Sequence, residues 1–163
     1  MCVLAQSVDV AKVTACLSTG WEFLSGECRA FEHVPDVPPP LGGAEFCYFL
    51  PLAVPGAATA GGVGVFIERS DARTIAANMF GEPSHEIHAS KLNDACAEAC
   101  NVLAECVTLN ITSQANVSIG LPFRADNLVF AQIFTTCVPV AIYRGNTRAG
   151  PLFVIAYEIP NPS

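Results

Sequence analysis

The sequence predicts an α+β domain in which a mostly antiparallel sheet packs against three helices. Residues 8–25 repeat apolar side chains every three or four positions, the pattern of an amphipathic helix. Residues 85–111 contain neither Gly nor Pro and form the longest helical candidate. The last third of the chain is rich in Val, Ile, Phe and Thr, which favours strands. A length of 163 residues fits one domain spanning 1–163.

The N-terminal third supplies the first helix and three strands. A short strand is expected over 28–34, and the Pro- and Gly-rich stretch 35–43 is typical of a loop. Two buried strands, about 44–54 and 62–68, are joined by a Pro-Gly turn. The apolar face of the first helix consists of Val10, Val13, Leu17, Trp21 and Leu24.

A second helix begins at Ser70-Asp71 and stops at Gly81, before the long helix over 85–111. Its apolar side chains are Ile75, Ala76, Met79 and Phe80. The remaining segments are expected to be three strands, with a turn at 144–147 between the last two. These strands cover 117–121, 128–143 and 152–159.

Charge and hydropathy exclude two classes of partner. Eight Lys and Arg against fifteen Asp and Glu give a net charge of −7, which is unsuited to neutralising nucleic-acid phosphates. Residues 46–67 carry no charge, but they contain too many Pro and Gly residues for a membrane-spanning helix. No basic residue precedes Lys12, so no secretory signal is visible.

The cysteines are expected to be free buried thiols that act as small apolar side chains. No C-x-x-C pair occurs, and no second pair completes a metal site with Cys96 and Cys100. Free thiols imply a reducing cytoplasm. The eight are Cys2, Cys16, Cys28, Cys47, Cys96, Cys100, Cys106 and Cys137.

The long helix carries a narrow polar stripe. At about 100° per residue, Glu98, Asn101 and Glu105 fall within about 40° of Asp94. The opposite side is apolar apart from Asn110, near the end. Most such stripes are simply solvated helix faces, yet this one has no basic residue after Lys91 to pair with its acids. The opposite side holds Leu92, Cys96, Ala99, Leu103, Cys106 and Asn110.

Asp94, Glu98 and Asn101, with Pro122 21 positions after Asn101, resemble the signature of the CheC/CheX/FliY family of chemotaxis phosphatases. That signature is an acidic or Ser residue, a Glu and an Asn on a long helix, followed by a Pro. The order of elements over 8–160 agrees with the family. So do two short stretches, Met79 to Gly81 and Gly120 to Pro122.

The resemblance is to the single-site, CheX-like type. CheC-like members carry a second motif in another helix, where this chain has Asp9, Val13 and Cys16 and so lacks the Glu and the Asn. The resemblance therefore implies one site per chain. It also implies a homodimer whose sheets join across the interface.

By this resemblance the chain is a cytoplasmic protein phosphatase that hydrolyses the aspartyl phosphate of a CheY-like response regulator. The regulator supplies Mg²⁺ and a Lys, so the chain is expected to need no cofactor of its own. Asn101 is expected to position the attacking water, and Glu98 to engage the regulator's Lys. Asp94 is expected to aid docking or cap local structure, and Pro122 to fix a nearby loop.

Other interpretations stay open at the level of sequence. The chain could be a non-catalytic dimeric module that binds a signalling partner, or a small-molecule domain with a pocket under the apolar hairpin. Cys100 could act as a nucleophile, and His85 with His88 could bind a metal, although surface or capping roles are favoured for the histidines. Gly61-Gly62-x-Gly64 lacks the Lys of a P-loop and fits a packed strand better.

Overall fold

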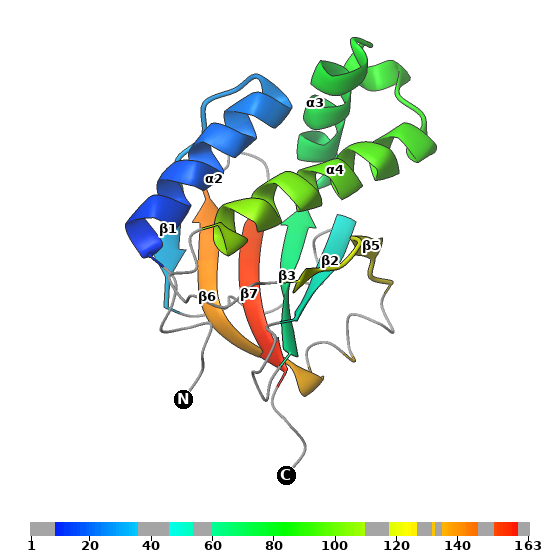
Figure 1. The fold of residues 1–163 in the computed structure, drawn as a ribbon. Coiled ribbons are helices and arrows are strands. Elements are labelled where there is room, and N and C mark those ends of the chain that lie inside the picture. The colour runs from blue at the N-terminus through cyan, green and yellow to red at the C-terminus, as the bar shows by residue number, and fades with distance from the viewer. Residues whose placement is uncertain are drawn as a thin grey trace.

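Three α-helices cover one face of an antiparallel sheet in the computed structural model (Figure 1). The structure describes residues 9–35, 46–53, 60–109, 118–126, 132, 135–146 and 152–159. Within them the α+β class, with three helices, is confirmed. The helices are α2 (Val10–Ser25), α3 (Arg69–Phe80) and α4 (Ala89–Thr108), and the 3₁₀ turn η2 (Ser84–Glu86) lies between the last two.

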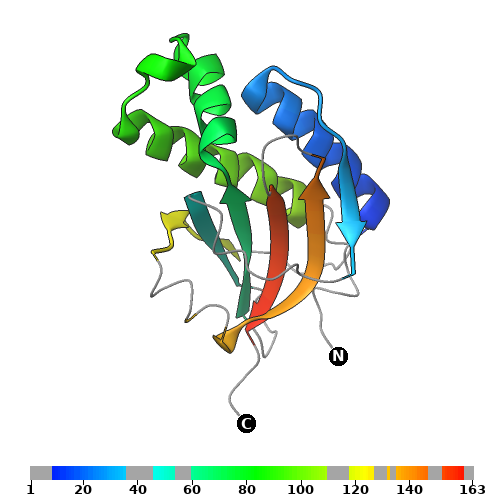
Figure 2. The ribbon, with the colours of Figure 1, turned by 180° about the vertical axis from the view of Figure 1, so that it is seen from behind.

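The sheet has seven strands among the described residues, all paired antiparallel, and Figure 2 shows it from behind. Its order is β1-β6-β7-β3-β2-β4, and β5 also pairs with β2. The strands are β1 (Phe31–Val34), β2 (Phe46–Ala53), β3 (Ala60–Ile67), β4 (Ser118–Ile119), β5 (Phe123–Arg124), β6 (Val138–Gly145) and β7 (Phe153–Ile159).

The two faces of the sheet are both buried, in separate clusters. Val154 and Ala156 of β7 belong to the larger core between the sheet and the helices. Phe153, Ile155 and Tyr157 alternate with them along the strand and belong to the cluster on the rear face. Burial on both faces explains why this strand is apolar from Phe153 to Tyr157 rather than alternating with polar residues.

The glycines of β3 make room for aromatic rings. The ring of Phe49 on β2 packs directly over Gly62, where a Cβ would lie 2.2 Å from its Cζ. Gly62 therefore serves sheet packing, as expected for a glycine in a packed strand. The P-loop alternative for Gly61-Gly62-x-Gly64 is wrong, since these residues lie inside β3.

The predicted first and second helices are confirmed, and the structure shows which residues cap their ends. Asp9 accepts a hydrogen bond from the backbone N–H of Lys12 at 3.2 Å and caps α2, and Gly26 ends it with a φ of 75°. Gly81 ends α3 in the same left-handed conformation, with a φ of 64°. The apolar faces are shorter than predicted. Val10, Met79 and Phe80 are exposed because they lie at helix ends, beyond the packed part.

The long helix begins later than predicted. Ser84–Glu86 forms the 3₁₀ turn, and His88 takes an extended conformation as the first flanking residue of α4. Pro83 precedes this turn and disfavours a continuous helix. The helix ends at Thr108, and Asn110 lies outside the described residues.

Two of the predicted strands also change. The strand expected over 128–143 begins only at Val138, because the chain before it is helical where it is described, with Thr135 and Thr136 donating to the carbonyl of Gln132. The turn expected at 144–147 starts late, since β6 continues to Gly145.

The remaining predicted strands are confirmed in shorter form. The strand predicted over 28–34 is β1, and that over 117–121 is reduced to the two residues of β4. The hairpin strands are β2 and β3, and the last strand is β7. The predicted loop at 35–43 and the Pro-Gly turn of the hairpin lie mostly or wholly outside the described residues. No helix among those described is both long and apolar enough to span a bilayer.

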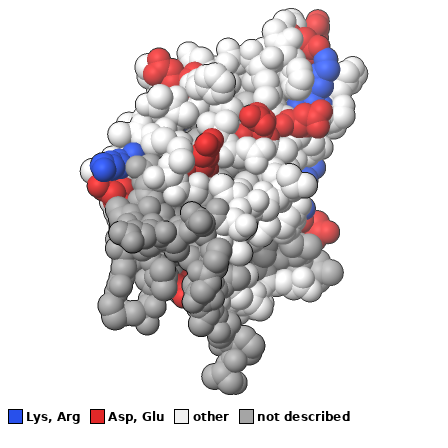
Figure 3. All heavy atoms as spheres, viewed as in Figure 1, with Lys and Arg blue, Asp and Glu red and all other residues white. Residues whose placement is uncertain are grey.

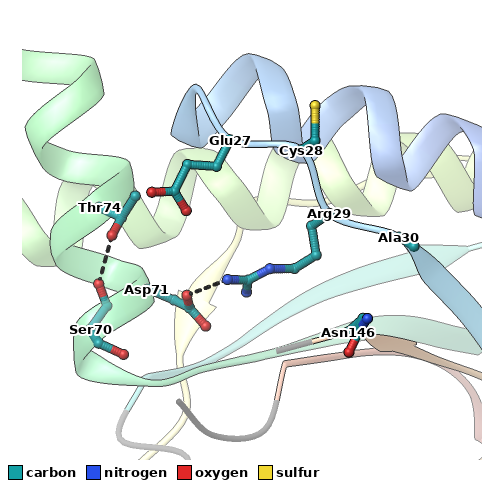
Figure 4. Close-up of a pocket in the computed structure, with 8 residues that line it drawn as sticks. All are labelled: Glu27, Cys28, Arg29, Ala30, Ser70, Asp71, Thr74 and Asn146. Carbon is teal, nitrogen blue, oxygen red and sulfur yellow. Dashed lines mark hydrogen bonds and ion pairs between the residues drawn. The ribbon is translucent and has the colours of Figure 1, made fainter. Parts of the chain in front are cut away.

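A buried ion pair joins the helices to the start of the sheet. Figure 4 shows Arg29, in the segment before β1, reaching across a hollow of about 570 Å³ toward Asp71 in the first turn of α3. The guanidinium donates to the carboxylate at 3.0 Å, and it also lies 4.7 Å from the ring centre of Trp21 on α2. Arg29 therefore holds α2, α3 and the approach to β1 together.

Asp71→Ala is expected to destabilise the fold by roughly 3–5 kcal/mol, because it leaves the Arg29 charge buried without its partner. Urea unfolding followed by circular dichroism measures the change. The double variant Arg29→Met/Asp71→Leu removes both charges and is expected to lose less. An equal or greater loss in the double variant would contradict the assignment.

Candidate functional site

The buried face of α4 holds the helix against the sheet and the other two helices. Six of its nine buried residues are Ala or Cys, so the helix backbone can lie close to its neighbours. Gly20 of α2 makes the same close approach possible, because a Cβ there would lie 3.3 Å from Cγ1 of Val102. The nine residues are Leu92, Ala95, Cys96, Ala99, Cys100, Leu103, Ala104, Cys106 and Val107.

The opposite face of α4 presents the polar stripe to solvent. Asp94, Glu98, Asn101 and Glu105 are all exposed. Figure 3 shows acidic side chains in a row across the surface over α4, among largely uncharged residues. Glu98 and Asn101 are three positions apart and therefore neighbours on this face. The structure thus brings the carboxylate and the carboxamide together on one exposed surface.

The stripe residues are available to a partner. Within the part of the chain that the structure describes, the side chains of Asp94, Glu98 and Asn101 make no hydrogen bond or ion pair. Lys91 is the basic residue nearest to them on the helix, and it pairs with Glu82 while its ammonium lies 5.5 Å from the ring centre of Phe80. No described group on α4 therefore neutralises the stripe.

A hydrogen-bond network next to Asp94 is the part of the site that the sequence did not reveal. The hydroxyl of Tyr48 on β2 donates to Oδ1 of Asn93 at 2.8 Å, and Nη1 of Arg124 on β5 donates to the same oxygen at 3.0 Å. Burial raises the pKa of Tyr48 to about 12, so its hydroxyl remains a donor at neutral pH. The guanidinium of Arg124 also lies 4.8 Å from the ring centre of Phe46.

This network places the Pro122 segment beside α4. Pro122 is half-buried between β4 and β5, two residues before the Arg124 that bonds to Asn93. The residues of the motif that are distant in sequence are therefore joined through Asn93, which directly precedes Asp94. Sequence spacing alone could not show this link, because it depends on how β5 pairs with β2.

Glu98 also lines a hollow of about 330 Å³ between the three helices. The other lining residues come from the last turns of α2 and α3, and two of them, Phe23 and Met79, are exposed apolar side chains. The remaining two are Leu24 and Asn78.

The cysteine-nucleophile alternative is wrong. Cys100 and Cys96 are fully buried on the packed face of α4, and burial raises the pKa of each thiol to about 12. Only the thiolate is a strong nucleophile, so neither group is reactive at neutral pH. All described cysteines are free thiols, as predicted, but Cys28 is exposed and Cys16 is half-buried.

The histidines lie on the surface before α4. His85 and His88 are exposed, and Nε2 of His85 lies 3.6 Å from the carboxylate of Glu86. His88 occupies the N-cap position of α4, but its side chain makes no capping hydrogen bond. No group of three possible metal ligands occurs among the described residues.

The hairpin end carries a shallow hollow of about 400 Å³, where the small-molecule alternative expected a pocket. It is lined by mainly apolar residues that include Leu52, Ile119 and Ile159, and the described lining contains no charged side chain. Ligand sites usually combine apolar walls with a few well-placed polar groups. Ser118 is the one polar side chain among the described residues that line this hollow, so it offers little to orient a ligand.

The corresponding positions of α2 have structural roles. Asp9 caps the helix and Val13 is fully buried, while Cys16 is half-buried beside the core. None of the three forms an exposed carboxylate–carboxamide pair. The described part of the chain accordingly holds one such stripe, on α4.

No protein-family model and no curated protein matches the chain. Solved structures do match it over nearly its whole length. A CheC-like chemotactic protein from Shewanella oneidensis has a TM-score of 0.64 at 14% identity, covering 91% of this chain and 96% of that one. CheX from Vibrio vulnificus has a TM-score of 0.62 at 14% identity, covering 91% and 95%.

A third similar structure is a complex. It contains CheX, CheY, BeF₃ and Mg²⁺ from Borrelia burgdorferi, with a TM-score of 0.62 at 12% identity and coverage of 93% of this chain and 97% of the matched one. At these identities the shared property is the fold. The chain has the CheX/CheC-like fold, and the resemblance inferred from its sequence is confirmed at that level.

Thiol labelling separates buried from exposed cysteines. At pH 8 a thiol with a pKa of about 12 is ionised in about one molecule in ten thousand, so Cys47, Cys96 and Cys100 are expected to resist iodoacetamide in the native protein. Exposed Cys28 is expected to react readily. Peptide mass mapping, with denatured protein as the control, measures this. Rapid native labelling of Cys100 would show that the thiol is accessible.

Proposed function

We propose that this chain is a protein phosphatase that stimulates hydrolysis of the aspartyl phosphate of a CheY-like response regulator. The observation that carries the proposal is the joint exposure of Glu98 and Asn101 on one face of α4, without partners among the described side chains. The shared fold supports it, because a complex with the same fold contains CheY. The acidic stripe is thus interpreted as a docking surface rather than a solvated face.

Asn101 is the residue proposed to act in the chemistry. A water oxygen attacks phosphorus in line with the aspartyl oxygen, the bond from phosphorus to that oxygen breaks, and inorganic phosphate and a free carboxylate result. The carboxamide can accept a hydrogen bond from the water without carrying a charge that repels the phosphoryl oxygens. Its contribution is orientation, which is the main task of a protein in phosphoryl transfer.

Glu98 is proposed to hold the regulator by a charge-assisted contact with the Lys of its active site. Asp94 and the Pro122 segment lie beside this contact through the Asn93 network, in a docking and supporting role. The regulator would supply the Mg²⁺ that neutralises the phosphoryl group, so this chain needs no cofactor of its own. Its free thiols fit a reducing cytoplasm, where we place the protein.

Asn101→Ala is expected to slow the stimulated decay on the order of 10²-fold, because water is no longer held in line. Release of inorganic phosphate from a phosphorylated CheY-like regulator measures the rate. Binding to the regulator should change little. If Asn101→Ala stimulates decay as well as the unmodified chain, the catalytic role is wrong. If the chain binds the regulator but never alters its decay, it is instead a non-catalytic interaction module.

Glu98→Gln is expected to weaken regulator binding roughly 10- to 100-fold, because it removes one charge of an ion-supported hydrogen bond. Glu105→Gln is the matched control, since Glu105 is also a glutamate and lies on the same exposed face seven positions further along α4. Titration with the regulator measures both. Equal losses in the two variants would indicate a general charge effect rather than a specific contact.

The family resemblance also leads us to propose a homodimer. Among the described strands β1 is at one end of the sheet and pairs only with β6, so no described strand pairs with its other edge, where the strand of a second chain could add. Light scattering after gel filtration is expected to give twice the 17.2 kDa chain mass. A mass of one chain at micromolar concentration would contradict the dimer.

A further inference from the structure

The last turns of α2 and α3 form an apolar surface beside Glu98. Phe23 is 74% exposed and Met79 is 42% exposed, and both line the hollow of about 330 Å³ that Glu98 also lines. Figure 1 shows the upper end of α2 and the helix α3 above α4. We name Phe23, Met79 and the hollow between them the α2–α3 surface.

This surface is held rigidly. The side-chain amide of Asn78 on α3 donates to the carbonyls of Phe23 at 3.3 Å and of Leu24 at 2.9 Å on α2. Gly26 then caps α2 through a backbone hydrogen bond of 2.8 Å to Glu22. The exposed Phe23 therefore stands on an ordered helix end. An apolar side chain that is fixed in place before binding costs less entropy to use in an interface.

The negative charge at the α2–α3 surface indicates what kind of partner it suits. Glu98 contributes a carboxylate, and α2 and α3 both end here, with no basic residue in the last turn of either helix. Helix C-termini carry partial negative charge. The surface thus suits a partner that presents an apolar side chain close to a positive charge. An acidic or purely polar partner would leave both features unmatched.

From this combination we infer that the α2–α3 surface is a second contact for the response regulator, receiving an apolar side chain that lies near the regulator's active-site Lys. The inference rests on the proposed function. It separates two tasks within one interface. Glu98 and Asn101 contact the regulator's active site, whereas Phe23 and Met79 add affinity outside it.

The test compares Phe23→Ala and Met79→Ala with a control on the same helix, Val10→Ala. Val10 is also partly exposed but lies at the far end of α2, about 20 Å away at 1.5 Å per residue. The probe is the regulator with BeF₃ and Mg²⁺ for titrations, and the phosphorylated regulator for kinetics. Because Phe23 and Met79 are exposed, thermal unfolding of these variants should match that of the unmodified chain.

Each truncation is expected to raise the dissociation constant and KM about tenfold while kcat stays within about twofold. Phe23→Leu, which keeps an apolar side chain, should retain most of the affinity, and Val10→Ala all of it. The inference is overturned if Phe23→Ala and Met79→Ala bind as tightly as the unmodified chain. That result would leave the proposed function intact. If the unmodified chain neither binds nor dephosphorylates the regulator, both proposals fail together.

Discussion

The packing of small side chains on the inner face of α4 is the constraint on which the rest of the structure depends. Alanine and cysteine at six of nine buried positions bring the helix close to the sheet and to α2. Rotation of the helix would bury carboxylates of the stripe, which is costly without partners. The orientation that places Glu98 and Asn101 outward is therefore fixed by the core behind them.

Among the described residues of α4, no basic side chain neutralises the stripe, so the proposed reaction depends on charges that the regulator supplies. A self-sufficient hydrolase would need groups that neutralise phosphoryl charge, and Lys91 is already engaged by Glu82 and Phe80. An exposed carboxylate and carboxamide on a rigid helix can instead be inserted into a partner's site. The proposed substrate is a protein, so Glu98 and Asn101 need no deep pocket of their own, whereas small-molecule sites are usually concave.

The sequence predicted the features that repeat with a regular period. Patterns of side-chain size and polarity within one segment predict the inner face of α4 and its polar stripe. The same kind of pattern predicts the glycine-rich strand β3. Helix ends were less predictable, because Met79 and Phe80 continue the apolar pattern of α3 beyond the part that is packed. The prediction of a strand from residue 128 onward was wrong, because a segment rich in β-branched residues can still form a helical turn.

Two parts of the site could not be predicted, because they join segments that are distant in sequence. The hollow beside Glu98 lies where Asn78 bonds the end of α3 to the end of α2. The contact between Arg124 and Asn93 likewise depends on sheet pairing. Neither leaves a periodic signal in the chain.

The two hydrogen bonds to Oδ1 of Asn93 have a mechanical consequence. Tyr48 on β2 and Arg124 on β5 both donate to this atom. The Pro122 segment therefore stays beside α4 as long as Arg124 keeps its hydrogen bond to Asn93. The shape of the surface beside Asp94 is therefore set before any partner binds, and binding does not have to order it.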